Sequence, residues 1–173
     1  MPEENTIKKI GAASIIMMAS VFLSRLTGII REMAIAGIGG IKPEVDAYQI
    51  AFIIPEILNH VVAAGFLSIT FIPIITQYLV NGEDEKGYQV FSIIHNTFGL
   101  ILVCLIAVTM IWTPALVSVF APGIKDPATF DMAVKMTRII LPAQFFFFSG
   151  GLFMAVQFAR EKFFIPALAP LTY

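Results

Sequence analysis

The sequence is poor in charge, cysteine and histidine. Charged residues make up 13% of its 173 positions and the formal net charge is −1, whereas soluble domains carry about 25% charged residues. This composition excludes a soluble globular enzyme, a disordered chain and a nucleic-acid binder with a basic face. The single cysteine, Cys104, can form no internal disulfide, and the two histidines lie far apart. We therefore expect no metal and no other cofactor.

The common motifs of enzymes are missing as well. The chain has no glycine-rich phosphate loop with a lysine, no HExxH, no GxSxG and no pair of cysteines. These absences predict a protein that is not an enzyme.

Long apolar segments dominate the sequence instead. Hydrophobic residues make up 58% of it, and a helix needs about 20 apolar residues to cross a bilayer. We predict an all-α integral membrane protein with four transmembrane helices and the start of a fifth. The predicted helices span residues 7–38, 44–80, 90–120 and 130–159, and the fifth begins at about residue 164. Pro55, Gly65 and Pro142 interrupt these segments and are candidate bending points.

Basic residues in the short polar links predict the orientation. Such residues gather on the cytoplasmic side of a membrane protein. If the N-terminus is cytoplasmic, the outer links carry only Lys42 and Lys125, and the inner ones carry Lys8, Lys9, Lys86, Arg160 and Lys162. This excess favours a cytoplasmic N-terminus.

The first predicted helix contains charges within its apolar run, in SVFLSRLTGIIRE at residues 20–32. At about 100° per residue, one side of this helix is apolar and the other is polar. The polar side holds Ser20, Ser24, Arg25, Thr27, Gly28, Arg31 and Glu32. Two interpretations remain open: the arginines line a polar cavity, or the helix has left the bilayer and they snorkel to its surface.

A second polar stripe follows in the segment 44–80. Asp46, Glu56 and His60 fall on one side of a helix together with Gln49, and Asn59 lies beside them. Pro55 breaks the register, and proline-broken helices are common at transporter binding sites. The alternative is that Glu56 and His60 pair four residues apart and hold two helices together.

Guanidinium groups are the chemistry that these segments offer. Arginine presents a planar fork of donors that suits phosphate or carboxylate. Two arginines in a membrane cavity therefore indicate binding of an anionic substrate, and the residues by themselves favour a transporter.

Several stretches narrow this hypothesis to a family. They are SRLTGIIREMAIAGIGG from Ser24, the segment from Asp46 to Ile74, APG at 121–123, the pattern of Arg138, Ile139 and Pro142, and IPALAP at 165–170. In order and spacing they resemble the opening of the MviN/MurJ family of lipid II flippases. These proteins belong to the multidrug/oligosaccharidyl-lipid/polysaccharide exporter superfamily.

The resemblance implies a fold of fourteen helices, with two six-helix lobes and a C-terminal pair around a V-shaped cavity. Residues 1–173 would form the N-terminal part of the first lobe, with the remaining helices of a full-length protein as partners. The implied activity is flipping of lipid II, a polyprenyl-pyrophosphate-linked peptidoglycan precursor, by alternating access in the bacterial cytoplasmic membrane for cell-wall synthesis. The implied contacts are this substrate and membrane lipids.

The family's essential cavity arginines fall on Arg25 and Arg31, and its acidic residue at the start of the second helix falls on Asp46. With these we group Ser24, Glu32, Glu56, Asn59 and His60 as candidate substrate-binding residues. The chain departs from the pattern where Asn59 replaces a third arginine, Glu56 an asparagine and Ala64 a glutamate. These departures leave two alternatives open: an exporter of another lipid-linked glycan or drug in the same superfamily, and a non-transporting membrane scaffold.

Overall fold

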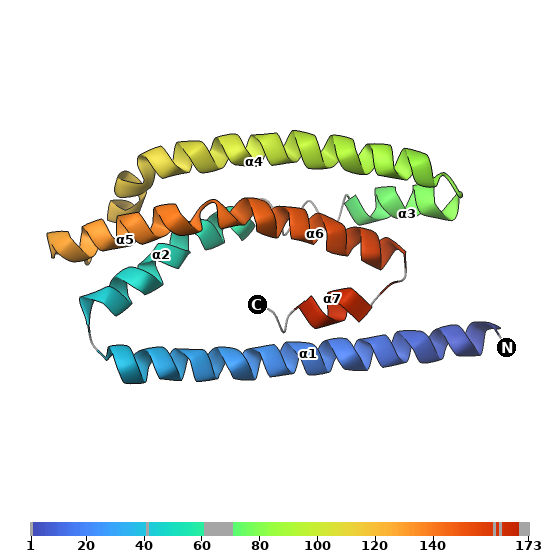
Figure 1. The fold of residues 1–173 in the computed structure, drawn as a ribbon, viewed down its shortest axis with the longest axis horizontal. Helices are drawn as coiled ribbons and strands as arrows, with labels where there is room; N and C mark the ends of the chain where they lie inside the picture. The colour runs from blue at the N-terminus through green and yellow to red at the C-terminus, as the bar shows by residue number, and fades with distance from the viewer. Residues whose placement is uncertain (1, 41, 61–70, 161, 163, 170–173) are drawn as a thin grey trace.

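The computed structural model describes residues 2–40, 42–60, 71–160, 162 and 164–169. Every element in this part of the chain is a helix (Figure 1), which confirms the predicted all-α class. The helices are α1 (Pro2–Gly39), α2 (Pro43–Asn59), α3 (Ile72–Val80), α4 (Asp84–Phe120), α5 (Pro127–Ile140), α6 (Ala143–Ala159) and α7 (Phe164–Leu168).

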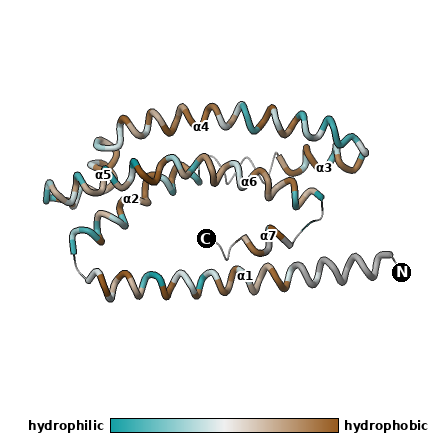
Figure 2. The backbone as a smooth tube through the Cα atoms, in the orientation of Figure 1, coloured by the Kyte–Doolittle hydropathy of each residue, from teal (hydrophilic) through white to brown (hydrophobic). Residues whose placement is uncertain are grey.

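Three segments of the described chain are long and apolar enough to cross a membrane. They are Ser14–Gly39, Asp84–Phe120 and Pro127–Ala159. The segment predicted to be the second crossing, 44–80, is represented by α2 and α3, and residues 61–70 between them lie outside the described residues. Figure 2 shows hydrophilic residues gathered at the turn between α3 and α4 and at the starts of α2 and α5.

Helices α2 to α6 form a bundle around one apolar core. Helix α4 lies along the nearly collinear pair α5 and α6, α3 packs against α4 and α6, and α2 packs most extensively against α5 (Figure 1). The residues that fill the core include Phe71, Ile75, Leu102, Val117, Leu141, Phe148 and Leu152. Alanines at positions 47, 51 and 133 are completely buried. Their small side chains allow α2 and α5 to approach closely.

Helix α1 lies apart from this bundle. It contacts α2 at one end, where the chain turns. It also contacts the short helix α7, which lies beside α1 away from that end (Figure 1). Only 6% of its most apolar window is buried, compared with 28% for each of the other two candidate spans. The first helix is therefore the least packed of the three.

The structure corrects two predicted boundaries. Residues 130–159 form two helices rather than one, because Pro142 has no N–H to continue the ladder of α5 and instead begins α6. Helix α4 begins at Asp84 rather than at residue 90. Its first turn carries Asp84 and Glu85, and acidic side chains are favourable near the positive end of a helix dipole.

Candidate functional site

The rest of the chain covers part of the polar side of α1, while Arg25, Arg31 and their neighbours Thr27 and Glu32 stay exposed. Ser20 is 5% exposed, and Ser24 and Gly28 are half-buried. The predicted apolar side points away, and its exposed members are Phe22, Leu23, Leu26, Ile29, Ile30 and Met33. In a bilayer this arrangement sets an apolar surface toward lipid and a polar one toward protein, as expected for a helix that borders a polar space.

Arg25 and Arg31 both keep exposed side chains on α1. A guanidinium nitrogen of Arg31 donates to the neighbouring Glu32 carboxylate at 3.2 Å, so part of its charge is balanced locally. Arg25 makes no ion pair with any residue that the structure describes. The Thr27 hydroxyl donates to the Leu23 carbonyl of the same helix at 2.5 Å. Within the described part of the chain, these polar groups are therefore not used to bind α1 to the bundle.

The polar stripe of α2 lies away from the bundle. The buried side of α2 holds Ala47, Ala51, Ile54, Pro55 and Leu58, which recur at the helical spacing of a packed face. Glu56 and His60 approach to 3.9 Å and remain 70% and 72% exposed, so they pair within one helix. Asn59 beside them is half-buried.

Of the three candidate bending points, two can be placed. Pro55 is buried inside α2, and the helix continues past it to Asn59. Pro142 lies where α5 gives way to α6. Gly65 lies outside the described residues.

A groove opens where α2 begins. Its volume is about 620 Å³, and the first turns of α2 and the loop between α4 and α5 form its two walls. Asp46 and Gln49 line the α2 wall, and Lys125 and Asp126 line the loop wall. The lining is mixed, because apolar side chains such as Ile50 and Ile53 accompany these polar ones.

Asp126 holds the loop wall in place. Its carboxylate accepts hydrogen bonds from the Thr129 hydroxyl at 2.6 Å and from the Thr129 backbone N–H at 2.9 Å. These bonds cap the first turn of α5 and lower the pKa of Asp126 below its ordinary value of 3.8. The carboxylate is therefore charged at neutral pH.

The candidate residues form local groups rather than one continuous cluster. Arg31 meets Glu32 on α1, Glu56 meets His60 on α2, and Asp46 lies at the groove. Within the described residues, no hydrogen bond or ion pair joins a side chain of α1 to one of α2.

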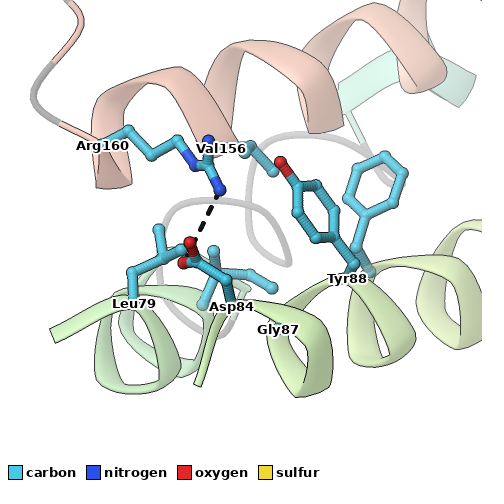
Figure 3. Close-up of a pocket in the computed structure, with 8 residues that line it drawn as sticks. Leu79, Asp84, Gly87, Tyr88, Val156 and Arg160 are labelled. Atoms are coloured by element: carbon cyan, nitrogen blue, oxygen red, sulfur yellow. Dashed lines mark ion pairs between the residues drawn. The ribbon is translucent and has the colours of Figure 1, made fainter. Parts of the chain in front are cut away.

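Sequence reasoning missed a cluster at the opposite end of the bundle. Arg160, at the end of α6, reaches Asp84 at 3.6 Å and lies 5.2 Å from the centre of the Tyr88 ring (Figure 3). The cavity beside them has a volume of about 10 Å³, which is the size of a single water. This cluster ties α6 to the start of α4 and is too small to bind a substrate.

A second contact that sequence reasoning missed joins α4 to α6. The Nε2 atom of His95 in α4 lies 3.1 Å from the Ser149 hydroxyl of α6. The rings of Phe91, Phe145, Phe148 and Phe153 surround the imidazole at 5.9 to 6.4 Å between centroids. The cluster of phenylalanines from 145 to 148 was the only signal of this site in the sequence.

Comparisons with known proteins agree on one family. A family model described as lipid II flippase MurJ matches residues 35–173. The chain is 30% identical to the lipid II flippase MurJ of Thermosipho africanus over 158 residues. This alignment covers 91% of this chain and 32% of that protein. It is 31% identical over 163 residues to the probable lipid II flippase MurJ of Aquifex aeolicus, covering 91% of this chain and 31% of that protein.

The lipid II flippase MurJ of Burkholderia cenocepacia is 31% identical over 154 residues, which are 86% of this chain and 29% of that protein. The chain thus spans about a third of the length of the curated relatives it matches. No solved structure matches it. All three relatives carry the name of the family that the sequence resembles.

Proposed function

Because the chain belongs to the MurJ family of lipid II flippases, we propose that it contributes to flipping lipid II across the bacterial cytoplasmic membrane. Lipid II here means a peptidoglycan precursor linked to a polyprenyl pyrophosphate. One observation supports a role for these particular residues: Arg25 and Arg31 stay exposed beside the covered part of the polar side of α1, and its large apolar side chains lie on the other side. Flipping moves the substrate between leaflets without breaking a bond, so no catalytic residue is needed.

We further propose four crossings and the start of a fifth. Helix α1 is the first crossing, and α2 and α3 together with the residues between them are the second. Helix α4 is the third, α5 and α6 joined at Pro142 are the fourth, and α7 begins the fifth. With the N-terminus in the cytoplasm, the groove beside Asp46 opens at the outer face of the membrane and the Arg160 cluster lies at the inner face.

The substrate's pyrophosphate is the group that Arg25 and Arg31 would bind. Guanidinium forks match the geometry of phosphate oxygens, and their attraction is strong where water is scarce. The two arginines lie six residues apart, which is about 9 Å along a helix, so an anionic head can pass from one to the other. Ser24 lies next to Arg25 and offers a hydroxyl, and Glu32 keeps Arg31 oriented.

Alternating access supplies the rest of the mechanism. The break at Pro142 allows α5 and α6 to change their mutual angle, and Pro55 and Gly65 would serve the same purpose in the second crossing. Helices corresponding to the remaining length of the relatives would form the opposite wall of the pathway.

The test is to neutralise both arginines. The double variant Arg25→Gln with Arg31→Gln should fail to support growth of a strain depleted of its own flippase. Because both side chains are exposed on α1, membrane levels on an immunoblot should remain those of the wild type. The matched control, Arg25→Lys with Arg31→Lys, keeps the charge but loses the fork and should restore growth only in part. Full growth with the double glutamine variant would contradict the proposal.

A further inference from the structure

A single hydrogen bond joins α5 to a weak point of α4. The Nε of Arg138, in the last turn of α5, donates to the backbone carbonyl of Met110 in α4 at 3.0 Å. We infer that Arg138 is a positioning residue: it fixes the bend of α4 at Pro114 and so holds the loop that forms one wall of the groove beside Asp46.

The partner of Arg138 is the carbonyl that a proline leaves without its normal donor. In an α-helix the carbonyl of residue 110 accepts a bond from the N–H of residue 114. Residue 114 is a proline inside α4, so it has no N–H, and its ring also pushes against the preceding turn. Inside a membrane no water replaces the missing donor, and such a carbonyl must find another partner.

Thr113 is the second donor near this carbonyl. Its hydroxyl lies 2.8 Å from the Thr109 carbonyl and 3.2 Å from the Met110 carbonyl. A hydroxyl has one hydrogen to donate, and the shorter contact is with Thr109. Arg138 is therefore the principal donor to Met110, and its charge strengthens the bond.

The bend in α4 also controls the position of the groove's loop wall. Helix α4 turns toward α5 over its last turns (Figure 1), where Val117 is completely buried. The chain then forms the loop from Ala121 to Asp126, which lines the groove opposite Asp46 and Gln49. The direction of α4 beyond Pro114 thus determines how far this loop wall lies from α2.

The same contact explains a charge in an unexpected place. Arg138 lies within a segment apolar enough to cross the membrane, where a charged side chain usually marks a binding site or a partner. Here the partner is a backbone carbonyl of the neighbouring helix. Arg138 differs in this respect from Arg25 and Arg31, which donate to no group of the bundle among the residues that the structure describes.

The geometric part of this inference is independent of transport, and its effect on flipping rests on the proposed function. We would measure the geometry with spin labels at Gln49→Cys and Lys125→Cys, one on each wall, in the Cys104→Ser background. Cys104 is the only cysteine in the sequence, so the labels would occupy only the chosen positions. The protein is reconstituted in liposomes, and the distance between the two spin labels is measured by pulsed electron paramagnetic resonance.

Three variants separate the hydrogen bond from other roles of Arg138. Arg138→Met places a methyl group where Nε was and removes the donor. Arg138→Gln carries an amide nitrogen the same number of bonds from Cα as Nε, so it keeps a donor and removes the charge. Pro114→Ala returns a backbone N–H to the Met110 carbonyl, so that Arg138 is no longer needed there.

We expect Arg138→Met to move the label distance outside the wild-type distribution, and Arg138→Gln to return it there. In the Pro114→Ala background, Arg138→Met should cause no further change. If Arg138→Met is not recovered from membranes, the double variant with Pro114→Ala should be. An unchanged distance in Arg138→Met, or an equal effect with and without Pro114, would overturn the inference. So would a double variant that is also lost.

Growth of the flippase-depleted strain is measured in parallel. If both proposals hold, Arg138→Met reduces growth and Arg138→Gln restores it. If the distances follow the expected pattern but growth is indifferent to Arg138 and to the arginines of α1, the positioning role stands and the proposed function fails.

Discussion

Helix α1 and the bundle of α2 to α6 use their polar residues in opposite ways. In the bundle they join helices: His95 meets Ser149, Arg138 meets Met110 and Arg160 meets Asp84. On α1, among the residues that the structure describes, they bond within the helix, as Thr27 does with Leu23 and Arg31 with Glu32. The bundle thus uses polar contacts for its own structure, whereas the guanidinium groups of α1 stay available to a ligand.

The two regions also differ in how their apolar residues are placed. The core side chains of the bundle are nearly inaccessible, and Phe148 is 1% exposed. The large apolar side chains of α1 are mostly exposed, and Phe22 is 67% exposed. In a membrane this difference is not a defect, because lipid covers an apolar face as well as protein does. It teaches that stability and the proposed binding chemistry reside in separate parts of the chain, and paired substitutions in the two regions test that separation.

The largest contrast should come from truncating one phenylalanine in each region. Phe148→Ala leaves a cavity in the bundle and should lower the free energy of unfolding by about 2 to 3 kcal/mol. This is less than the roughly 3 to 5 kcal/mol that such a change costs in water-soluble proteins, because here the side chain leaves protein for lipid and not for water. Phe22→Ala should change it by less than about 0.5 kcal/mol. Unfolding in detergent measures both, and equal losses would contradict the separation.

Two glycines offer the next contrast. A Cβ at Gly99 of α4 would lie 3.3 Å from Cε2 of Phe145, whereas a Cβ at Gly28 of α1 would meet nothing within 4 Å. Gly28→Ala should therefore stabilise its helix by about 0.5 to 1 kcal/mol. In Gly99→Ala the ring of Phe145 must shift, so the gain should be absent or reversed. The thermal midpoints of the two variants give the answer, and a gain of the same size at both sites would count against the packing described for α4 and α6.

Removing a hydroxyl group from each region should change the free energy of unfolding by a smaller amount. Ser149→Ala removes a bond between helices and should cost about 0.6 kcal/mol, the mean for such bonds in membrane proteins. Thr27→Ala removes a bond within α1, where the Leu23 carbonyl keeps its backbone partner, and should cost less. The measurement is again the unfolding free energy, and combining Ser149→Ala with His95→Phe should add little to the loss.

The smallest effect concerns the loop that faces α2. The pKa of Asp126 is lowered by the bonds from Thr129, so its ionised form is the one that stabilises the native state. That contribution is present above 3.8 and is lost as the pH falls through the lower folded value. The thermal midpoint of Asp126→Ala should therefore lie below that of the wild type at neutral pH and approach it at the most acidic pH. If the difference between the two thermal midpoints were the same at every pH, the charge of Asp126 would not contribute to stability.

Much of this molecule could be predicted from its residues. Apolar run length determines that the segments are helices, since a backbone in lipid must satisfy its own hydrogen bonds. The spacing of polar residues also determines which side of α1 carries Arg25 and Arg31, because the helical period converts sequence directly into direction. The large side chains of the predicted apolar face of α1 are exposed in the structure.

Contacts between helices could not be predicted from the sequence in this way. That Arg138 reaches the carbonyl released by Pro114 depends on which helices lie side by side. The groove beside Asp46 depends in the same way on a loop from a distant part of the chain, between α4 and α5. Helical periodicity describes one helix at a time, whereas these features belong to pairs of helices, and only tertiary packing decided which pairs would form.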